Sequence, residues 1–169
     1  MKARLGRSGQ PFDVLDVSGG YPRQFYSLEL QPQFAGSKES SARIGLCSSR
    51  TGIEPQLLCD CVLNVVYVGV DSSLCVLDLK NQQTKRLELG APFYWMARLT
   101  THNATLVVYE TGLLSLIPGG EIVWKHETHD VIATVALSSH DALQVALLEG
   151  GTAVVDLVSG RVAQTLDGK

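Results

Sequence analysis

Apolar residues recur along the chain in short runs of about four to eight residues, rich in Val, Leu, Ile, Tyr and Thr. These residue types favour β-strands. Turn-forming pairs separate the runs, among them Asp71-Ser72, Gly119-Gly120 and Gly150-Gly151. A sustained apolar stripe with helical spacing is missing, so the pattern predicts an all-β chain built from hairpins.

The same pattern repeats along the chain. Residues 101–106 (Thr-His-Asn-Ala-Thr-Leu) line up with residues 139–144 (Ser-His-Asp-Ala-Leu-Gln), an offset of 38 residues. A weaker copy begins near Pro55, where residues 65–68 match residues 107–110. Each copy reads as four strands separated by turns, which is typical of a repeat architecture.

This four-stranded unit of about 40 residues resembles the blades of WD40 and quinoprotein-type β-propellers. The turn at residues 139–141 leads into a strand, and residues 154–162 form the last hairpin of the unit. The resemblance covers roughly residues 55–168 and implies about three propeller-like blades. Because the Trp-Asp dipeptide and a quinone-docking motif are both missing, it implies no particular activity.

Residues 1–54 lie outside the clear repeats. We expect them to form an irregular, strand-containing segment that covers the repeat region, residues 55–169, within a single domain. A fourth, irregular blade with strands at residues 25–30 and 42–47 is one alternative. An open half-propeller and edge-to-edge pairing of two chains are the others, so we expect a monomer or an edge-paired dimer.

Composition narrows the class of partner. The chain has 169 residues, 45% of them hydrophobic, with 14 Lys and Arg against 17 Asp and Glu and a formal net charge of −3. Because acidic residues outnumber basic ones, the chain has no run of positive charge that could bind the phosphate backbone of a nucleic acid. We therefore expect no nucleic-acid binding. No apolar run has the length of a membrane span or of a secretory signal core, which predicts a cytoplasmic protein that does not bind membranes.

The cysteines offer a first candidate metal site. Cys47, Cys59, Cys61 and Cys75 are interpreted as thiols rather than as disulfides, because a chain of this size has a core of its own. Cys59 and Cys61 would share one face of a strand and could supply half of a metal site. Packing is the more economical explanation, since buried Cys behaves as a small hydrophobe.

Two of the histidines are further candidate ligands for this metal site. His126 and His129 flank Glu127 in a segment expected to be a loop, and with the two cysteines they could form a metal-binding or enzymatic site. His102 and His140 occupy equivalent repeat positions, which favours a structural role in turns. No nucleophile elbow, phosphate-binding glycine loop or zinc-protease motif is present, so the sequence predicts no catalytic residues, no cofactor and no bound metal.

A partner surface is the remaining candidate site. Three aromatic residues in a row, Phe93, Tyr94 and Trp95, cannot all face one side of a strand, so at least one should lie outside the core. An aromatic group rimmed by carboxylates suits an interface with a basic protein. The residues predicted to form it are Asp71, Phe93, Tyr94, Trp95, Glu127, His129, Asp130 and Glu149. The alternative is that Phe93 and Trp95 fill the space between blades.

These observations predict a non-enzymatic protein-binding module. Its most specific form is a small cytosolic inhibitor or immunity protein that masks a toxin or an enzyme, with a basic protein as the partner. Two alternatives remain: the metal-binding protein or enzyme described above, and a repeat scaffold that docks into a larger assembly.

Overall fold

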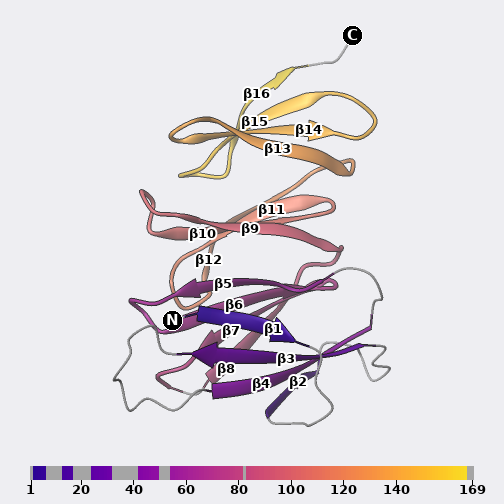
Figure 1. Cartoon of the computed structure of the whole chain (residues 1–169). Coiled ribbons are helices and arrows are strands. Elements are labelled where there is room, and N and C mark those ends of the chain that lie inside the picture. Colours follow the sequence, from indigo (N-terminus) through magenta and orange to yellow (C-terminus); the bar gives the residue numbers. More distant parts are fainter. Residues whose placement is uncertain are drawn as a thin grey trace. The chain divides into compact units, whose positions relative to one another are not determined.

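The computed structural model describes residues 2–6, 13–16, 24–31, 42–49, 54–81 and 83–166. In these ranges the regular structure consists of strands β1 to β16, arranged in four sheets of four strands (Figure 1). The described residues contain no helix able to span a membrane. The predicted all-β fold class is confirmed.

Contacts between residues divide the chain into two compact units, Met1–Gly90 and Ala91–Lys169. Unit 1 holds the sheets built from β1 (Lys2–Gly6), β2 (Asp13–Asp16), β3 (Gln24–Gln31), β4 (Ala42–Ser48), β5 (Gln56–Asp60), β6 (Val65–Val70), β7 (Ser73–Asp78) and β8 (Gln83–Glu88). Unit 2 holds those built from β9 (Phe93–Leu99), β10 (Ala104–Tyr109), β11 (Gly112–Leu116), β12 (Ile122–Glu127), β13 (Ile132–Ser139), β14 (Ala142–Leu147), β15 (Thr152–Asp156) and β16 (Val162–Leu166). The expected division into residues 1–54 and 55–169 stays a prediction.

Three of the four sheets are regular meanders. In the sheets β5–β8, β9–β12 and β13–β16, each strand pairs antiparallel with the next strand in the chain. These sheets are the three predicted four-stranded repeats. Tight turns join their strands, and Asp71 and Asn103 adopt positive φ angles of 49° and 47° in two of them, a conformation that Asp and Asn tolerate better than most residues.

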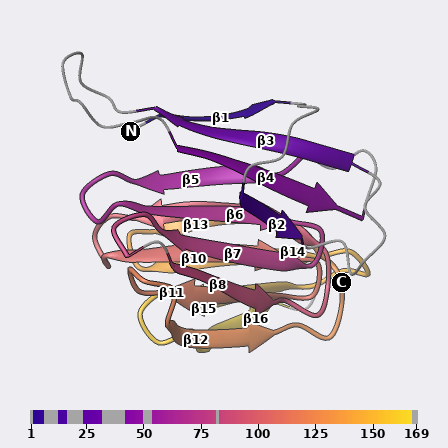
Figure 2. The same cartoon turned by 90° about the horizontal axis from the view of Figure 1, so that it is seen from below.

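The first sheet is irregular, as expected for the N-terminal segment. Its strand order is β1-β3-β4-β2, and β2 runs parallel to β4 (Figure 2). Strands β3 and β4 include the two segments that the sequence offered for a fourth irregular blade, residues 25–30 and 42–47.

Alternate side chains of the strands build the core of unit 1. Tyr26 and Leu28 of β3 and Leu46 of β4 pack with side chains of β6 and β7, including Val68 and the buried Cys75. Burial raises the pKa of the Cys75 thiol to about 11, so this thiol stays protonated at neutral pH and acts as an apolar group.

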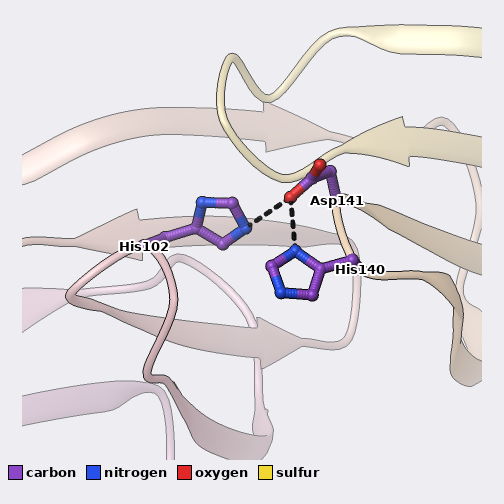
Figure 3. A group of neighbouring side chains, drawn as sticks. All are labelled: His102, His140 and Asp141. Atoms are coloured by element: carbon purple, nitrogen blue, oxygen red, sulfur yellow. Dashed lines mark hydrogen bonds and ion pairs between the residues drawn. The ribbon is translucent and has the colours of Figure 1, made fainter.

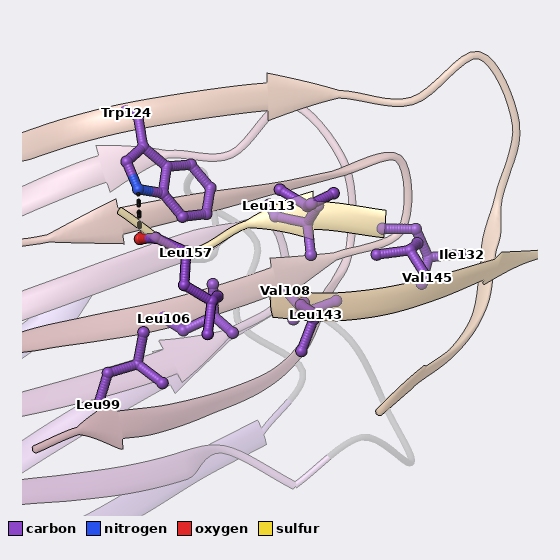
Figure 4. Packing of buried hydrophobic residues seen from close by; sticks show 10 residues of the cluster. Leu99, Leu106, Val108, Leu113, Trp124, Ile132, Leu143, Val145 and Leu157 are labelled. Carbon is purple, nitrogen blue, oxygen red and sulfur yellow. Dashed lines mark hydrogen bonds between the residues drawn. The ribbon is translucent and has the colours of Figure 1, made fainter. Parts of the chain in front are cut away.

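Unit 2 has its own core between its two sheets (Figure 4). The third sheet, β9–β12, contributes Leu106, Val108 and Trp124, and the fourth, β13–β16, contributes Val145 and Leu157, among others. The indole Nε1 of Trp124 donates a buried hydrogen bond of 3.0 Å to the carbonyl oxygen of Leu157. This bond satisfies the one polar atom of the ring while the rest of the ring is buried in the cluster.

Gly160 allows the indole this close approach. Its φ is +70°, and a Cβ atom at this position would lie 2.5–2.7 Å from carbon atoms of the Trp124 ring. Replacing it should therefore both strain the backbone and displace the ring.

We expect Gly160→Ala to lower the free energy of unfolding by about 2–4 kcal/mol, the sum of backbone strain and overpacking. Gly119→Ala is the matched control, because Gly119 has a φ of +95° but a methyl group there would have no atom within 4 Å. Urea unfolding followed by tryptophan fluorescence measures both. Equal losses in the two variants would show that the contact with Trp124 contributes nothing.

Candidate functional site

The turns of unit 2 gather at the two ends of its sheets. Because consecutive strands run antiparallel, β9 and β13 begin at the end where the β10–β11 and β14–β15 turns lie (Figure 1). We call this end the acidic end and define it as residues 92–95, 110–111, 127–130 and 148–151. These segments carry four carboxylates and no Lys or Arg.

Hydrogen bonds join the segments of the acidic end to one another. The amide of Glu110 donates to the carbonyl oxygen of Pro92 at 2.7 Å, and the carbonyl oxygen of Glu110 accepts from the amide of Ile132 at 2.8 Å. The carboxylate of Asp130 accepts from the amide of Glu149 at 2.7 Å. The acidic end therefore spans both sheets of unit 2 as a connected surface.

The three aromatic residues of the acidic end lie at the start of strand β9. Phe93 is buried, whereas Tyr94 and Trp95 are 41% and 37% exposed. The pairing explains this: Trp95 lies opposite Val108 and Phe93 opposite Tyr109, so that Tyr94 is the extra residue of a β-bulge. The expectation that at least one of the three aromatics lies outside the core is confirmed.

Glu127 ends β12 beside a lysine. Lys125 Nζ lies 2.5 Å from Glu127 Oε1 and 5.5 Å from the centre of the Tyr109 ring. The hydrogen bond from Lys125 is the main reason that the pKa of Glu127 lies below its usual value. Burial raises the pKa of Tyr109, and the charge of Glu127 raises it further. At neutral pH the pair therefore consists of an ionised carboxylate and a neutral phenol.

The other predicted contact residues divide into two groups. Asp130 uses its carboxylate within the surface, where it also accepts a hydrogen bond of 2.6 Å from the amide of Val131. The side chains of His129 and Glu149 are exposed. Of the predicted contact residues in unit 2, Tyr94, Trp95, Glu127, His129 and Glu149 therefore have side chains that are accessible to a partner.

Asp71 lies in unit 1 and is engaged there. It is 6% exposed, and its carboxylate accepts hydrogen bonds from Ser48 Oγ at 2.9 Å, the Ser49 amide at 2.8 Å and Ser49 Oγ at 3.0 Å. These bonds fasten the end of β4 to the β6–β7 turn. A structural role accounts for this carboxylate, which has little surface left for a partner.

The residues of the alternative metal site lie in different settings. Strand β5 ends at Asp60, so Cys61 is an exposed turn residue, and the expectation that Cys59 and Cys61 share one face of a strand is wrong. Cys59 packs against the core of unit 1. His126 belongs to β12 rather than to a loop, whereas His129 follows that strand. All four cysteines fall within the described part of the chain, and none of them is in a disulfide.

The structure instead brings His102, His140 and Asp141 together (Figure 3). His102 lies in the β9–β10 turn, and the other two residues lie in the β13–β14 turn, at the end of unit 2 opposite the acidic end. Asp141 Oδ1 is 3.1 Å from His102 Nε2 and 2.9 Å from His140 Nδ1. The predicted equivalence of the two turns is confirmed. Equivalent turns of neighbouring sheets lie side by side, so the repeat offset of 38 residues was the signal in the sequence that could have located this cluster.

Comparison with known proteins shows which solved structures have a similar fold. No protein-family model and no curated protein matches the chain. Among solved structures, BamB from Moraxella catarrhalis is 14% identical with a TM-score of 0.50, and the match covers 97% of this chain and 51% of that one. BBS1N, solved in complex with ARL6DN, is also 14% identical with a TM-score of 0.50, covering 98% of this chain and 53% of that one. The WD40 β-propeller domain of Doa1 is 18% identical with a TM-score of 0.48, covering 84% and 48%.

The chain has a propeller-like repeat fold. Its four-stranded sheets can therefore be called blades, as the sequence resemblance implied. The chain spans about half the length of the solved structures that it matches. At this level of identity the likeness establishes the architecture of the blades and nothing about their chemistry.

The contact between Lys125 and Glu127 can be tested by titrating the Glu127 carboxyl in a variant that lacks the lysine. Replacing Lys125 with Met removes the main cause of the lowered pKa, so we expect the Glu127 carboxyl to titrate at a higher pH in Lys125→Met than in the wild type. The stability that this lowered pKa contributes is fully present above the ordinary value of 4.5 and is lost as the pH falls through the lowered pKa.

Carbon-detected NMR of the Glu127 side chain as a function of pH measures this shift. Arg161→Gln is the control, because it also removes one positive charge from unit 2 but lies in the β15–β16 turn at the opposite end. An unchanged Glu127 titration in Lys125→Met would contradict the assignment.

Proposed function

We propose that this chain is a non-enzymatic protein-binding module and that the acidic end of unit 2 is its contact surface. The observation that carries the proposal is the pair of exposed aromatic side chains, Tyr94 and Trp95, on a surface whose segments carry four carboxylates and no Lys or Arg. The partner class that fits this surface is a basic protein.

The physical roles of the two kinds of side chain differ. Exposed Tyr and Trp offer large contact areas at a low cost in side-chain entropy, and such residues dominate binding energy at the centres of interfaces. Carboxylates such as Glu149 attract a basic partner and set its orientation, which affects the association rate more than the final affinity. The strands and hydrogen bonds beneath them limit the reorganisation required on binding.

The propeller-like fold is compatible with this role. BBS1N, one of the structures with a similar fold, was solved as a complex with ARL6DN. From that comparison we take only that the expected ligand is a protein. No property of that particular partner is assigned to the partner of this chain.

In its more specific form, the proposal is a cytosolic inhibitor or immunity protein that masks a toxin or an enzyme. The acidic net charge of −3 and the compact β units support an inhibitor of a basic protein, and the absence of a catalytic motif in the sequence is consistent with it. The second candidate is a scaffold subunit of a larger assembly, a role with which the propeller-like repeat fold is compatible.

Charge reversal tests the surface. We expect Glu149→Lys to weaken binding to a basic partner by at least tenfold, mainly through slower association at low ionic strength. Glu121→Lys is the matched control, because it makes the same charge change on an exposed residue in the β11–β12 turn at the other end of unit 2. Surface plasmon resonance at two salt concentrations measures both, and equal effects would rule out the acidic end as the contact surface.

The partner for that measurement comes from co-expression with the product of the adjacent gene, followed by size-exclusion chromatography and an assay of the toxicity or activity of the product. The inhibitor proposal expects a stable complex and a loss of that activity. A complex without inhibition would favour the scaffold candidate, and the absence of any complex would contradict the inhibitor.

The aromatic pair has its own test. We expect Tyr94→Ala to cost about 2 kcal/mol of binding free energy, roughly a 30-fold rise in Kd, because an aromatic anchor loses its contact area. Val123→Ala, which truncates an exposed residue of β12, is the control. Isothermal titration calorimetry against the same partner distinguishes them, and an effect no larger than that of the control would remove Tyr94 from the interface.

A further inference from the structure

The cluster of His102, His140 and Asp141 is not part of the proposed interaction surface. It lies at the end of unit 2 opposite the acidic end, where the β9–β10 turn of one blade adjoins the β13–β14 turn of the next. We propose that these three residues form a binding site for a divalent transition-metal ion, with Zn²⁺ as the ion that suits the donors best.

The spacing of the donor atoms carries the proposal. Zn²⁺ binds imidazole nitrogen and carboxylate oxygen at about 2.0–2.2 Å, so that donor atoms around a tetrahedral ion lie about 3.3 Å apart. Asp141 Oδ1 lies 3.1 Å from His102 Nε2 and 2.9 Å from His140 Nδ1, and all three donor atoms lie within 4.8 Å of one another. Small side-chain rotations would place all three around one ion.

The orientation of His102 provides a second observation. Its Nε2 atom is buried and makes no hydrogen bond of acceptable geometry, although Asp141 Oδ1 is close to it. The two imidazole rings meet edge to face, with centroids 6.0 Å apart. A buried nitrogen that points at a carboxylate without a well-directed hydrogen bond is suited to donate its lone pair to a metal ion.

The chemistry of the donors selects the class of ion. Two neutral imidazoles and one carboxylate bind zinc and other late first-row ions, whereas Ca²⁺ and Mg²⁺ prefer sites made of oxygen donors alone. His140 and Asp141 are 67% and 58% exposed, so the ion can enter from solvent and a water molecule can complete its coordination.

The carboxylate of Asp156 lies close enough to His102 to interact with it electrostatically, but it already accepts hydrogen bonds from another residue. Its carboxylate accepts hydrogen bonds from the Ser159 amide at 2.7 Å and from Ser159 Oγ at 2.6 Å. These bonds are the main cause of its lowered pKa. We therefore assign it no place among the ligands, and the site has three protein donors.

A metal ion held here would connect two blades. His102 belongs to the third sheet and the other two ligands to the fourth, so the ion would bridge turns that are otherwise separate in sequence. Because it would bind the folded arrangement better than the unfolded chain, Zn²⁺ should raise the unfolding temperature of the protein.

The experiment uses the full chain without an affinity tag, stripped with a chelator and titrated with ZnCl₂ by isothermal titration calorimetry. We expect one equivalent of Zn²⁺ to bind and the unfolding temperature to rise with zinc concentration. His102→Gln and Asp141→Asn should each weaken binding at least tenfold and abolish the thermal shift. Far-UV circular dichroism checks that both variants retain their strands, and the exposed position of Asp141 keeps the test valid if His102→Gln fails to fold.

Two control variants exclude adventitious zinc binding. His129→Gln removes an exposed histidine of the same unit, and Cys61→Ser removes the exposed thiol, and both should bind Zn²⁺ as the wild type does. Visible absorption of the Co²⁺-substituted protein reports the same site, and its bands should disappear in Asp141→Asn. The proposal is overturned if the wild type binds no zinc, if Asp141→Asn binds it unchanged, or if a control variant loses it.

Discussion

The packing of one four-stranded sheet against the next is the interaction on which the rest of this structure depends. A single sheet of this size has an apolar face that it cannot bury by itself. In unit 2, Leu106 and Val108 of one blade meet Leu143 and Val145 of the next, and these side chains are at most 1% exposed. The alternation of side chains along each strand supplies these faces, so that a shift of one residue in register would turn the apolar set away from its partner.

This packing also determines where the surface residues meet. Because successive blades present the same elements in the same order, equivalent turns lie next to each other even when they are far apart in sequence. His102 and Asp141 meet in this way at one end of unit 2. At the other end, the carbonyl oxygen of Glu110 in one blade accepts a hydrogen bond from the amide of Ile132 at the start of the next blade. Both candidate sites therefore belong to pairs of blades, and neither could form on one blade alone.

Much of the fold could be predicted from the sequence, because the signals that determine it act between residues close together in the chain. Strand propensity, short apolar runs and turn residues such as Gly150 act over a few residues, and the repeat places the same signals three times along the chain. The first sheet was harder to predict, because its order β1-β3-β4-β2 includes a parallel pair that no short turn encodes. The exposure of both Tyr94 and Trp95 depends on a bulge, a property of the pairing with β10 that the residues 92–95 do not carry themselves. Asp71 was assigned to the surface for the same reason, because its partners Ser48 and Ser49 are more than 20 residues away in sequence.

Each of the two units contains a hydrophobic cluster between its own two sheets, so neighbouring sheets stabilise each other within each unit, as in repeat proteins. The fourth sheet has Gln144 at the repeat position of Leu106, and Gln144 is exposed where Leu106 is fully buried. A polar residue at this position makes this face of the fourth sheet more compatible with water than the equivalent face of the third sheet. The same substitution limits the apolar area that this face of the fourth sheet can offer to another protein surface.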